Sequence, residues 1–208
     1  MDFKPQDLLI GVIDLFVIIL PGALLIFATL RVVYGYPLKP LPPAVWSDLA
    51  AAAAFVCGSY LLGHLVSYLG SVSEDAFHRV VKERVLQRDE EDRKAVAEVL
   101  ARSGVRVDNP SNVRRQAATY LRLHDPAAAV HVERKDADRR FFRNVTVVLL
   151  FPVVAFVVRG SWTEALFWGV LFAASLLRYF DQQKKFTRDI YEYFRLSTGL
   201  AAPPKSSR

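Results

Sequence analysis

Long apolar blocks, with most of the charged residues confined between them, limit the folds open to this chain. Leu8–Leu30 is apolar apart from Asp14, and Leu49–Leu69 contains one histidine, His64, and no acidic or basic side chain besides it. At a helical rise of about 1.5 Å per residue, each block can cross a hydrocarbon core roughly 30 Å thick. The composition alone, 52% hydrophobic and 23% charged, would be less decisive.

Two further apolar blocks follow near the C-terminal end. Val145–Val158 reaches spanning length if the preceding residues continue the helix and extend their charges to the interface. Trp162–Phe180 is the fourth block, and Gly160-Ser161 between the two predicts a tight helical hairpin. The alternatives are a cleaved signal peptide for the first block and a buried core helix for the third. We favour spans, because the first block is long for a signal peptide and contains Asp14.

The sequence therefore predicts an all-α, polytopic integral membrane protein with four transmembrane helices. A helical cytoplasmic domain should separate the second span from the third. The expected organisation is a first hairpin (1–70), the cytoplasmic domain (71–140), a second hairpin (141–181), a cytoplasmic helical extension (182–198) and a disordered tail (199–208).

Basic residues predict the orientation. Of the 27 Lys and Arg residues, 16 lie in 71–144 and seven from Arg178 onward. Because basic residues flanking membrane spans favour the cytoplasmic side, both termini and the middle domain should be cytoplasmic, in a multi-pass protein of the cell inner (plasma) membrane.

Capping signals divide the middle domain into helices. Ser73 with two acidic residues, Asp89, Asn109-Pro110 and Asp125-Pro126 each resemble a helix start, and Gly104 resembles a C-terminal cap. The helix that begins at Pro126 should run directly into the third span. After the fourth span, apolar residues at helical spacing predict an extension that packs on the middle domain or, less favoured, lies on the membrane surface.

Two ionisable residues lie within the first two spans. Asp14 and His64 are each about six residues from the cytoplasmic end of their span, or about 9 Å. Because isolated charges are costly in hydrocarbon, we expect them to pair, or to form a ring across subunits, as a pH-responsive or ion-coordinating site. The alternative is that Asp14 reaches the headgroups and His64 bonds a backbone carbonyl.

Small residues at four-residue spacing in the second span predict a helix-packing face: Ser59, Gly63 and Ser67. Tyr60, His64 and Tyr68 form an adjacent polar stripe. This face could serve contacts within one chain or between copies, and we favour a homo-oligomer. Pro21-Gly22 and Pro152 each predict a helix kink.

Signals for chemistry are weak, and we predict no enzyme, no metal site and no cofactor. Glu74 with His78, and His131 with Glu133, Asp136 and Asp138, match no known metal motif and fit solvated helix faces. Five arginines could bind an anionic ligand or lipid headgroups: Arg102, Arg106, Arg114, Arg115 and Arg122. The 13 acidic residues of the same segment favour lipid headgroups over a nucleotide, and we expect no DNA binding.

Two functions fit these features. The favoured one is an oligomeric inner-membrane channel or pore-forming effector gated through its cytoplasmic domain, in a layout that suits bacterial stress or anti-phage (antiviral) defence by analogy of architecture only. The other is a membrane-anchored sensor or scaffold that recruits a soluble partner protein through the cytoplasmic domain.

Overall fold

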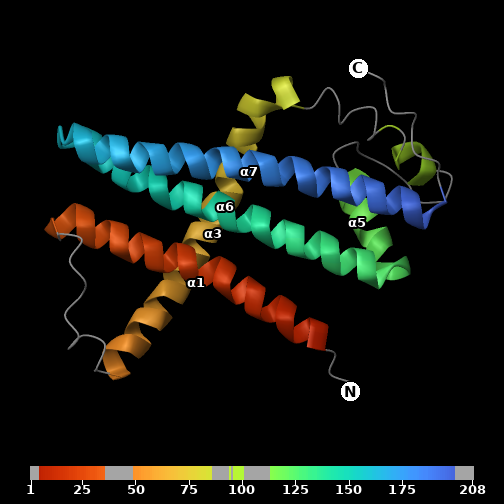
Figure 1. The fold of residues 1–208 in the computed structure, drawn as a ribbon, viewed down its shortest axis with the longest axis horizontal. Helices are drawn as coiled ribbons and strands as arrows, with labels where there is room; N and C mark the ends of the chain where they lie inside the picture. The colour runs from red at the N-terminus through yellow and green to blue at the C-terminus, as the bar shows by residue number, and fades with distance from the viewer. Residues whose placement is uncertain (1–4, 36–48, 86–93, 95, 101–112, 200–208) are drawn as a thin grey trace. The chain divides into compact units, whose positions relative to one another are not determined.

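The part of the chain that the structure describes consists of helices and short connections (Figure 1). The computed structural model describes residues 5–35, 49–85, 94, 96–100 and 113–199, with the backbone alone for 5–14, 34, 49 and 74–85. Its main helices are α1 (Pro5–Tyr34), α3 (Leu49–Val85), α5 (Val113–His124), α6 (Pro126–Val158) and α7 (Trp162–Ser197). These described residues contain no strand, which confirms the all-α class.

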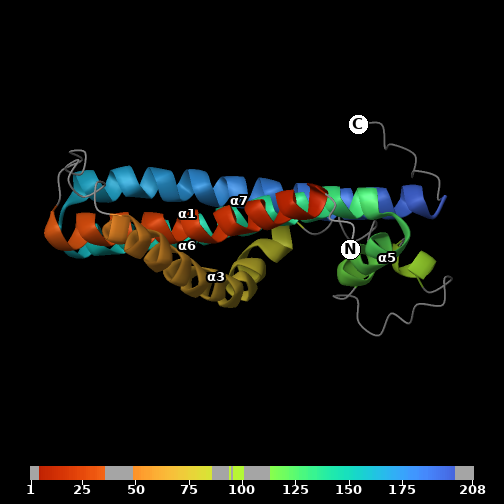
Figure 2. The ribbon, with the colours of Figure 1, turned by 90° about the horizontal axis from the view of Figure 1, so that it is seen from below.

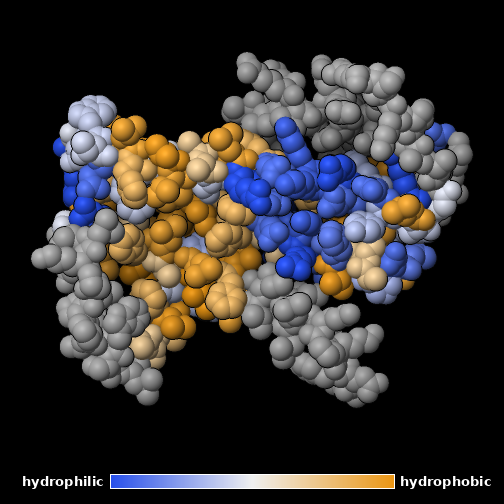
Figure 3. Space-filling view, viewed as in Figure 1, coloured by the Kyte–Doolittle hydropathy of each residue, from blue (hydrophilic) through white to orange (hydrophobic). Residues whose placement is uncertain are grey.

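Three helical segments of the described chain are long and apolar enough to cross a membrane: Leu15–Val33, Ala50–Ser73 and Pro126–Val158. They correspond to the first three predicted spans. The fourth predicted span forms the first half of α7 and is not among them. Glu164 and Arg178 lie inside that segment and lower its mean hydropathy. Figure 3 shows the apolar side chains that gather over the helices containing these segments.

The chain divides into two compact units, each made of segments distant in sequence. Unit 1 contains residues 1–76 and 137–181, and unit 2 contains residues 77–136 and 182–208. Helices α6 and α7 each contribute residues to both units.

Unit 1 packs α1 beside the C-terminal half of α6 and the N-terminal half of α7, while α3 crosses α1 steeply (Figure 1 and Figure 2). Its hydrophobic core combines residues of the three aligned helices: Ala28, Val32, Leu149, Phe156, Ala165 and Trp168. Helix α3 contributes no residue to this core, and its own buried residues include Ser59, Gly63, Val66 and Gly70.

Unit 2 has a hydrophobic core of its own. It is formed by the short helical segment 96–100, α5, the start of α6 and the end of α7, through Val96, Leu100, Val113, Ala117, Leu121, Ala128, Val132, Phe186, Ile190, Tyr191 and Phe194. The predicted extension after the fourth span therefore packs within this unit, which agrees with the favoured alternative.

Two predicted boundaries are confirmed in atomic detail. The Asp125 carboxylate accepts a hydrogen bond from the Ala128 amide at 3.0 Å, as an N-cap does. Gly160 adopts a φ of 72°, and the amides of Gly160 and Ser161 bond the carbonyls of Val157 and Phe156 at 3.0 Å each. This is a Schellman motif, which ends α6 and allows α7 to begin two residues later.

One predicted boundary is wrong. Ser73 does not begin a helix, because α3 continues without interruption from Leu49 to Val85. The hydroxyl groups of Ser71 and Ser73 donate to the carbonyls of Tyr68 and Gly70, three residues earlier in the same helix. A serine that bonds back to the preceding turn is accommodated inside a helix, so it does not act as a cap here.

Several predictions fall on residues outside the described ones. These are the caps at Asp89, Gly104 and Asn109, the arginines Arg102 and Arg106, and most of the tail 199–208.

Candidate functional site

The crossing of α1 and α3 is built on two glycines. A β-carbon added at Gly22 would overlap the carbonyl group of Ser59, and one added at Gly63 would overlap the carbonyl group of Ile18. Ser59 is fully buried there. The two backbones therefore touch directly, as they do where small residues line a membrane helix contact. Two members of the small-residue face, Ser59 and Gly63, pack within one chain, and Ser67 is half-buried.

Because one face of α3 is held against α1, the remaining faces of the helix are turned outward. One outward face is polar and comprises Cys57, Tyr60, His64, Tyr68 and Ser71, spaced by three or four residues and all exposed. We call it the α3 polar stripe. It contains the predicted stripe of Tyr60, His64 and Tyr68 and adds Cys57 at one end and Ser71 at the other.

A second outward face of α3 is apolar and lies beside the polar stripe. It comprises Leu61, Leu65, Leu69 and Val72, which are 68, 51, 47 and 59% exposed. The helix thus carries three kinds of surface: one packed on α1, one apolar and one polar.

Of the two residues predicted to form an intramembrane pair, the structure describes the side chain of His64 but not that of Asp14. His64 is exposed on the α3 polar stripe, with its ring edge-on to Tyr60 at 4.6 Å between centroids. Asp14 lies in α1, but its side chain is outside the described residues. The pairing stays a prediction.

The two prolines predicted to kink helices are buried within unbroken helices. Pro21 is a residue of α1 and Pro152 a residue of α6. Pro21 precedes Gly22, so the backbone of α1 gives up a hydrogen-bond donor directly beside the crossing with α3.

A buried polar layer lies between α6 and its neighbours in unit 1. Asn144 is fully buried beside Gly70 of α3, and its side-chain oxygen and nitrogen hydrogen-bond to no described residue. Nearby in the sequence, the Thr146 hydroxyl bonds the Ser175 hydroxyl of α7 at 3.0 Å and the Phe142 carbonyl at 2.8 Å. Buried polar groups are usually satisfied, so Asn144 is an exception that calls for a functional or conformational reason.

Charged side chains join the end of α1 to the connection between α6 and α7. Arg31 in the last turn of α1 forms an ion pair with Glu164 in the first turn of α7. Arg159, which follows α6, donates to the Val32 carbonyl at the end of α1. These contacts fix the end of α1 to the α6–α7 hairpin.

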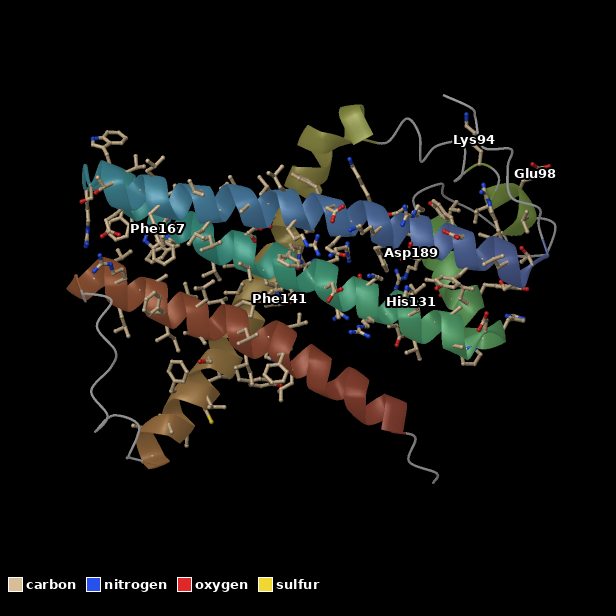
Figure 4. All side chains as sticks on the ribbon, viewed as in Figure 1. Lys94, Glu98, His131, Phe141, Phe167 and Asp189 are labelled. Carbon is tan, nitrogen blue, oxygen red and sulfur yellow. The ribbon has the colours of Figure 1, made fainter. Side chains whose placement is uncertain are left out.

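A groove of about 710 Å³ opens between α1, α6 and α7 of unit 1. Most of its wall is apolar and aromatic, with Leu24, Phe27, Phe167, Trp168 and Leu171 among the lining residues. Phe167 is labelled on α7 in Figure 4. We call this groove between α1, α6 and α7 the lateral groove.

In unit 2, most of the described side chains that were considered for metal or anion binding contact a side chain of another helix. His131 of α6 lies 3.8 Å from the Asp189 carboxylate of α7. Both residues are labelled in Figure 4. Arg122 bonds Glu133 at 3.0 Å, and the guanidinium of Arg114 lies 5.6 Å from the centre of the Phe186 ring. Arg115 is exposed.

The predicted anion-binding arginines of unit 2 are only partly described. Three of the five arginines in the proposed anion-binding cluster are described, and two of those pair with different neighbours on α6 and α7. No group of three or more His, Cys, Asp and Glu side chains that could bind a metal is found among the described residues. The side chains of Glu74 and His78 lie outside them.

Sequence reasoning missed the lateral groove, the burial of Asn144 and the partner of His131. A polar residue at the start of an apolar run was the only signal for Asn144, and no signal in the sequence indicated the groove. No protein-family model, curated protein or solved structure matches this chain.

Proposed function

We propose that this chain is a multi-pass protein of the inner membrane, with four spanning helices and both termini in the cytoplasm. Several copies assemble into a channel or pore, and the α3 polar stripe faces its interior. The exposed polar stripe on a membrane-spanning helix carries this proposal. Polar residues within membrane spans face the interior of a bundle or a water-filled cavity, because hydrocarbon gives them no hydrogen-bond partner.

The three surfaces of α3 assign a neighbour to each face of the helix. The face with Ser59 and Gly63 packs on α1, the face with Leu61 and Leu65 faces lipid tails, and the polar stripe faces other copies around an aqueous path. Within the described part of a single chain, the His64 ring is exposed. Assembly therefore removes the cost of placing the stripe in lipid.

Gating fits the continuity of α6 and α7. Each helix contains residues of unit 1 and residues of the core of unit 2. We propose that unit 2 is cytoplasmic and that a change in its packing is transmitted along these helices to the buried polar layer around Asn144. A role in bacterial stress or anti-phage defence would suit such a gated pore.

The single cysteine of the chain provides a direct test, because Cys57 belongs to the polar stripe. The cysteine thiolate, which forms only where water reaches the sulfur, is the nucleophile that attacks a thiosulfonate and displaces its sulfinate group. A charged, membrane-impermeant thiosulfonate should therefore modify Cys57 in reconstituted protein and reduce its conductance in planar bilayers. The Cys57→Ser variant should conduct and be insensitive.

A matched control moves the cysteine to the apolar face of the same helix. In Cys57→Ser/Leu65→Cys the thiol should face lipid and react far more slowly. Equal labelling of the two positions would contradict the assignment of the faces. Absence of conductance from the unmodified protein in every lipid mixture would overturn the channel itself.

Native mass spectrometry in mild detergent tests the assembly independently. A closed ring of several copies is expected, and His64→Leu should alter its stoichiometry or stability while Leu65→Met leaves it unchanged. A monomer would contradict the proposal.

A second function, a membrane-anchored scaffold, is favoured by one observation. Unit 2 has its own core and exposes two large apolar side chains, Leu123 (74%) and Leu196 (69%). If the two side chains form one contiguous apolar patch, that patch suits the docking of a soluble partner. A stoichiometric soluble protein that co-purifies with the wild type and is lost in Leu123→Asp would support this function over the channel.

A further inference from the structure

The lateral groove combines an apolar wall with one strongly polar end. Arg31, Thr163 and Glu164 line it where α1 ends and α7 begins, and Phe142, Ala174 and Ser175 line it at the other end. Arg31 and Glu164 form an ion pair that is only partly buried, with side chains 20 and 32% exposed. A site with one charged end and an apolar body fits an amphipathic ligand.

The length of the groove agrees with one acyl chain. From Glu164 to Ser175 is 11 residues along α7, or about 16 Å at the helical rise. Half of a hydrocarbon core about 30 Å thick is about 15 Å, which is the depth that the acyl chains of one leaflet occupy. The charged end lies where the helices end, and therefore where headgroups would be.

The charges at that end are complementary to a zwitterionic headgroup. A phosphate can accept from the Arg31 guanidinium, and an ammonium group can approach the Glu164 carboxylate. An opposed pair of this kind suits a headgroup with both charges better than one with a phosphate alone.

Trp168 adds a donor at a suitable depth. It lies one helical turn deeper than Glu164, is only 4% exposed, and its indole N–H bonds to no described residue. Buried indole N–H groups usually have a partner. In a glycerophospholipid the ester carbonyls lie just below the phosphate, at the depth of this residue. Because the indole nitrogen itself is buried, an ester carbonyl reaches it only after a shift of the Trp168 side chain.

We infer that the lateral groove binds one zwitterionic, amine-bearing phospholipid of the leaflet at the Arg31 end. Its phosphate lies at Arg31, its ammonium at Glu164 and one acyl chain along α7 towards Ser175. This inference rests on the membrane insertion in the proposed function, and it does not depend on conductance or on the number of copies.

Two neighbouring alanines of α7 allow a matched test. Ala174 lines the groove and Ala173 does not, and both are exposed. Full-length protein is incubated with phosphatidylethanolamine or phosphatidylglycerol and washed with detergent to remove loosely bound lipid. Its mass is then measured by native mass spectrometry. Wild type and Ala173→Phe should each retain one phosphatidylethanolamine per chain, and Ala174→Phe should lose it. Phosphatidylglycerol should be retained less in all three.

Three results would overturn the inference: equal lipid retention in the two variants, no retention by the wild type, or dissociation of an oligomer by Ala174→Phe alone. The last would assign the groove to a second copy of the chain. The same spectra report the number of chains, so failure of the oligomer is seen separately from failure of lipid binding.

A fluorescence measurement keeps the inference testable if Ala174→Phe does not fold. In Trp46→Phe/Trp162→Phe, Trp168 is the only tryptophan left. Phosphatidylethanolamine brominated on its acyl chains should quench this fluorescence strongly, since quenching requires near contact. Unquenched Trp168 in flotation-verified vesicles would contradict occupation of the groove by an acyl chain.

Discussion

Gly63 of α3 lies against the carbonyl group of Ile18 in α1 so closely that a β-carbon would not fit between them. Gly22 has the same relationship to the carbonyl of Ser59. The contact is therefore reciprocal, with a glycine on each helix. It attaches α3 to a core to which α3 itself contributes no residue.

Gly63→Ala should destabilise unit 1 by about 1–3 kcal/mol, because the methyl group forces the two backbones apart. Gly58→Ala in the same helix is the control, since its β-carbon would meet only the Ile26 side chain at 3.9 Å. The control should be neutral or gain up to about 1 kcal/mol from helix propensity. Unfolding in detergent followed by circular dichroism measures both, and equal stability of the two variants would contradict the close crossing.

The Thr146–Ser175 hydroxyl pair should couple α6 to α7. In a double-mutant cycle with Thr146→Val and Ser175→Ala, we expect a coupling of about 0.6 kcal/mol, the average for hydrogen bonds between membrane helices. The cycle is measured as free energy of unfolding in the same detergent. Additive single effects would show that the 3.0 Å contact contributes no coupling.

Asn144→Leu should stabilise the described conformation by about 1–3 kcal/mol, because it removes a buried amide that has no bond to a described residue. If the amide is satisfied in another state of the proposed channel, the same variant should also change the open probability. Thermal unfolding and planar-bilayer recording are therefore made on one preparation. A loss of stability would show that Asn144 is bonded in the folded protein.

Asp125→Ala should destabilise the start of α6 by about 1 kcal/mol through loss of its N-cap bond. Asp125→Asn should keep most of that stability, because an amide oxygen can accept the same hydrogen bond. Hydrogen exchange of the amides from Ala127 to Val130 should accelerate in the first variant only. Unchanged exchange in Asp125→Ala would contradict the capping role.

Phe194→Ala should destabilise unit 2 by about 3–5 kcal/mol, because Phe194 is fully buried and packs edge-on to Tyr120. Leu196→Ala, two residues later and exposed, should change stability by less than about 0.5 kcal/mol. Hydrogen exchange separates this effect from unit 1, where protection of α1 should not change. A loss of protection in both units would show that they unfold together.

Local signals were reliable where one short segment decides the outcome. Asp125-Pro126 and Gly160 gave correct helix boundaries, because a cap involves only the adjacent turn. Ser73 failed for a related reason, since a serine can cap a helix or bond back to the preceding turn. The choice depends on whether the chain continues as helix on both sides, and the apolar spacing around Ser73 did not show that.

Contacts between distant segments were less accessible. The small-residue pattern indicated a close packing face on α3, but it could not identify Ile18 and Gly22 as the opposing residues. The buried Asn144 and the lateral groove had no usable pattern, because each is formed by residues from helices far apart in the chain.

By itself the sequence determined the helical class, the apolar segments long enough to cross a membrane and the ends of several helices. These follow from hydrogen bonds and side-chain spacing within one or two turns. Only the tertiary structure decided which face of α3 meets α1, and hence that the stripe through Cys57 and His64 is exposed. That outcome depends on how closely two backbones approach across some forty residues of sequence, which no local periodicity encodes.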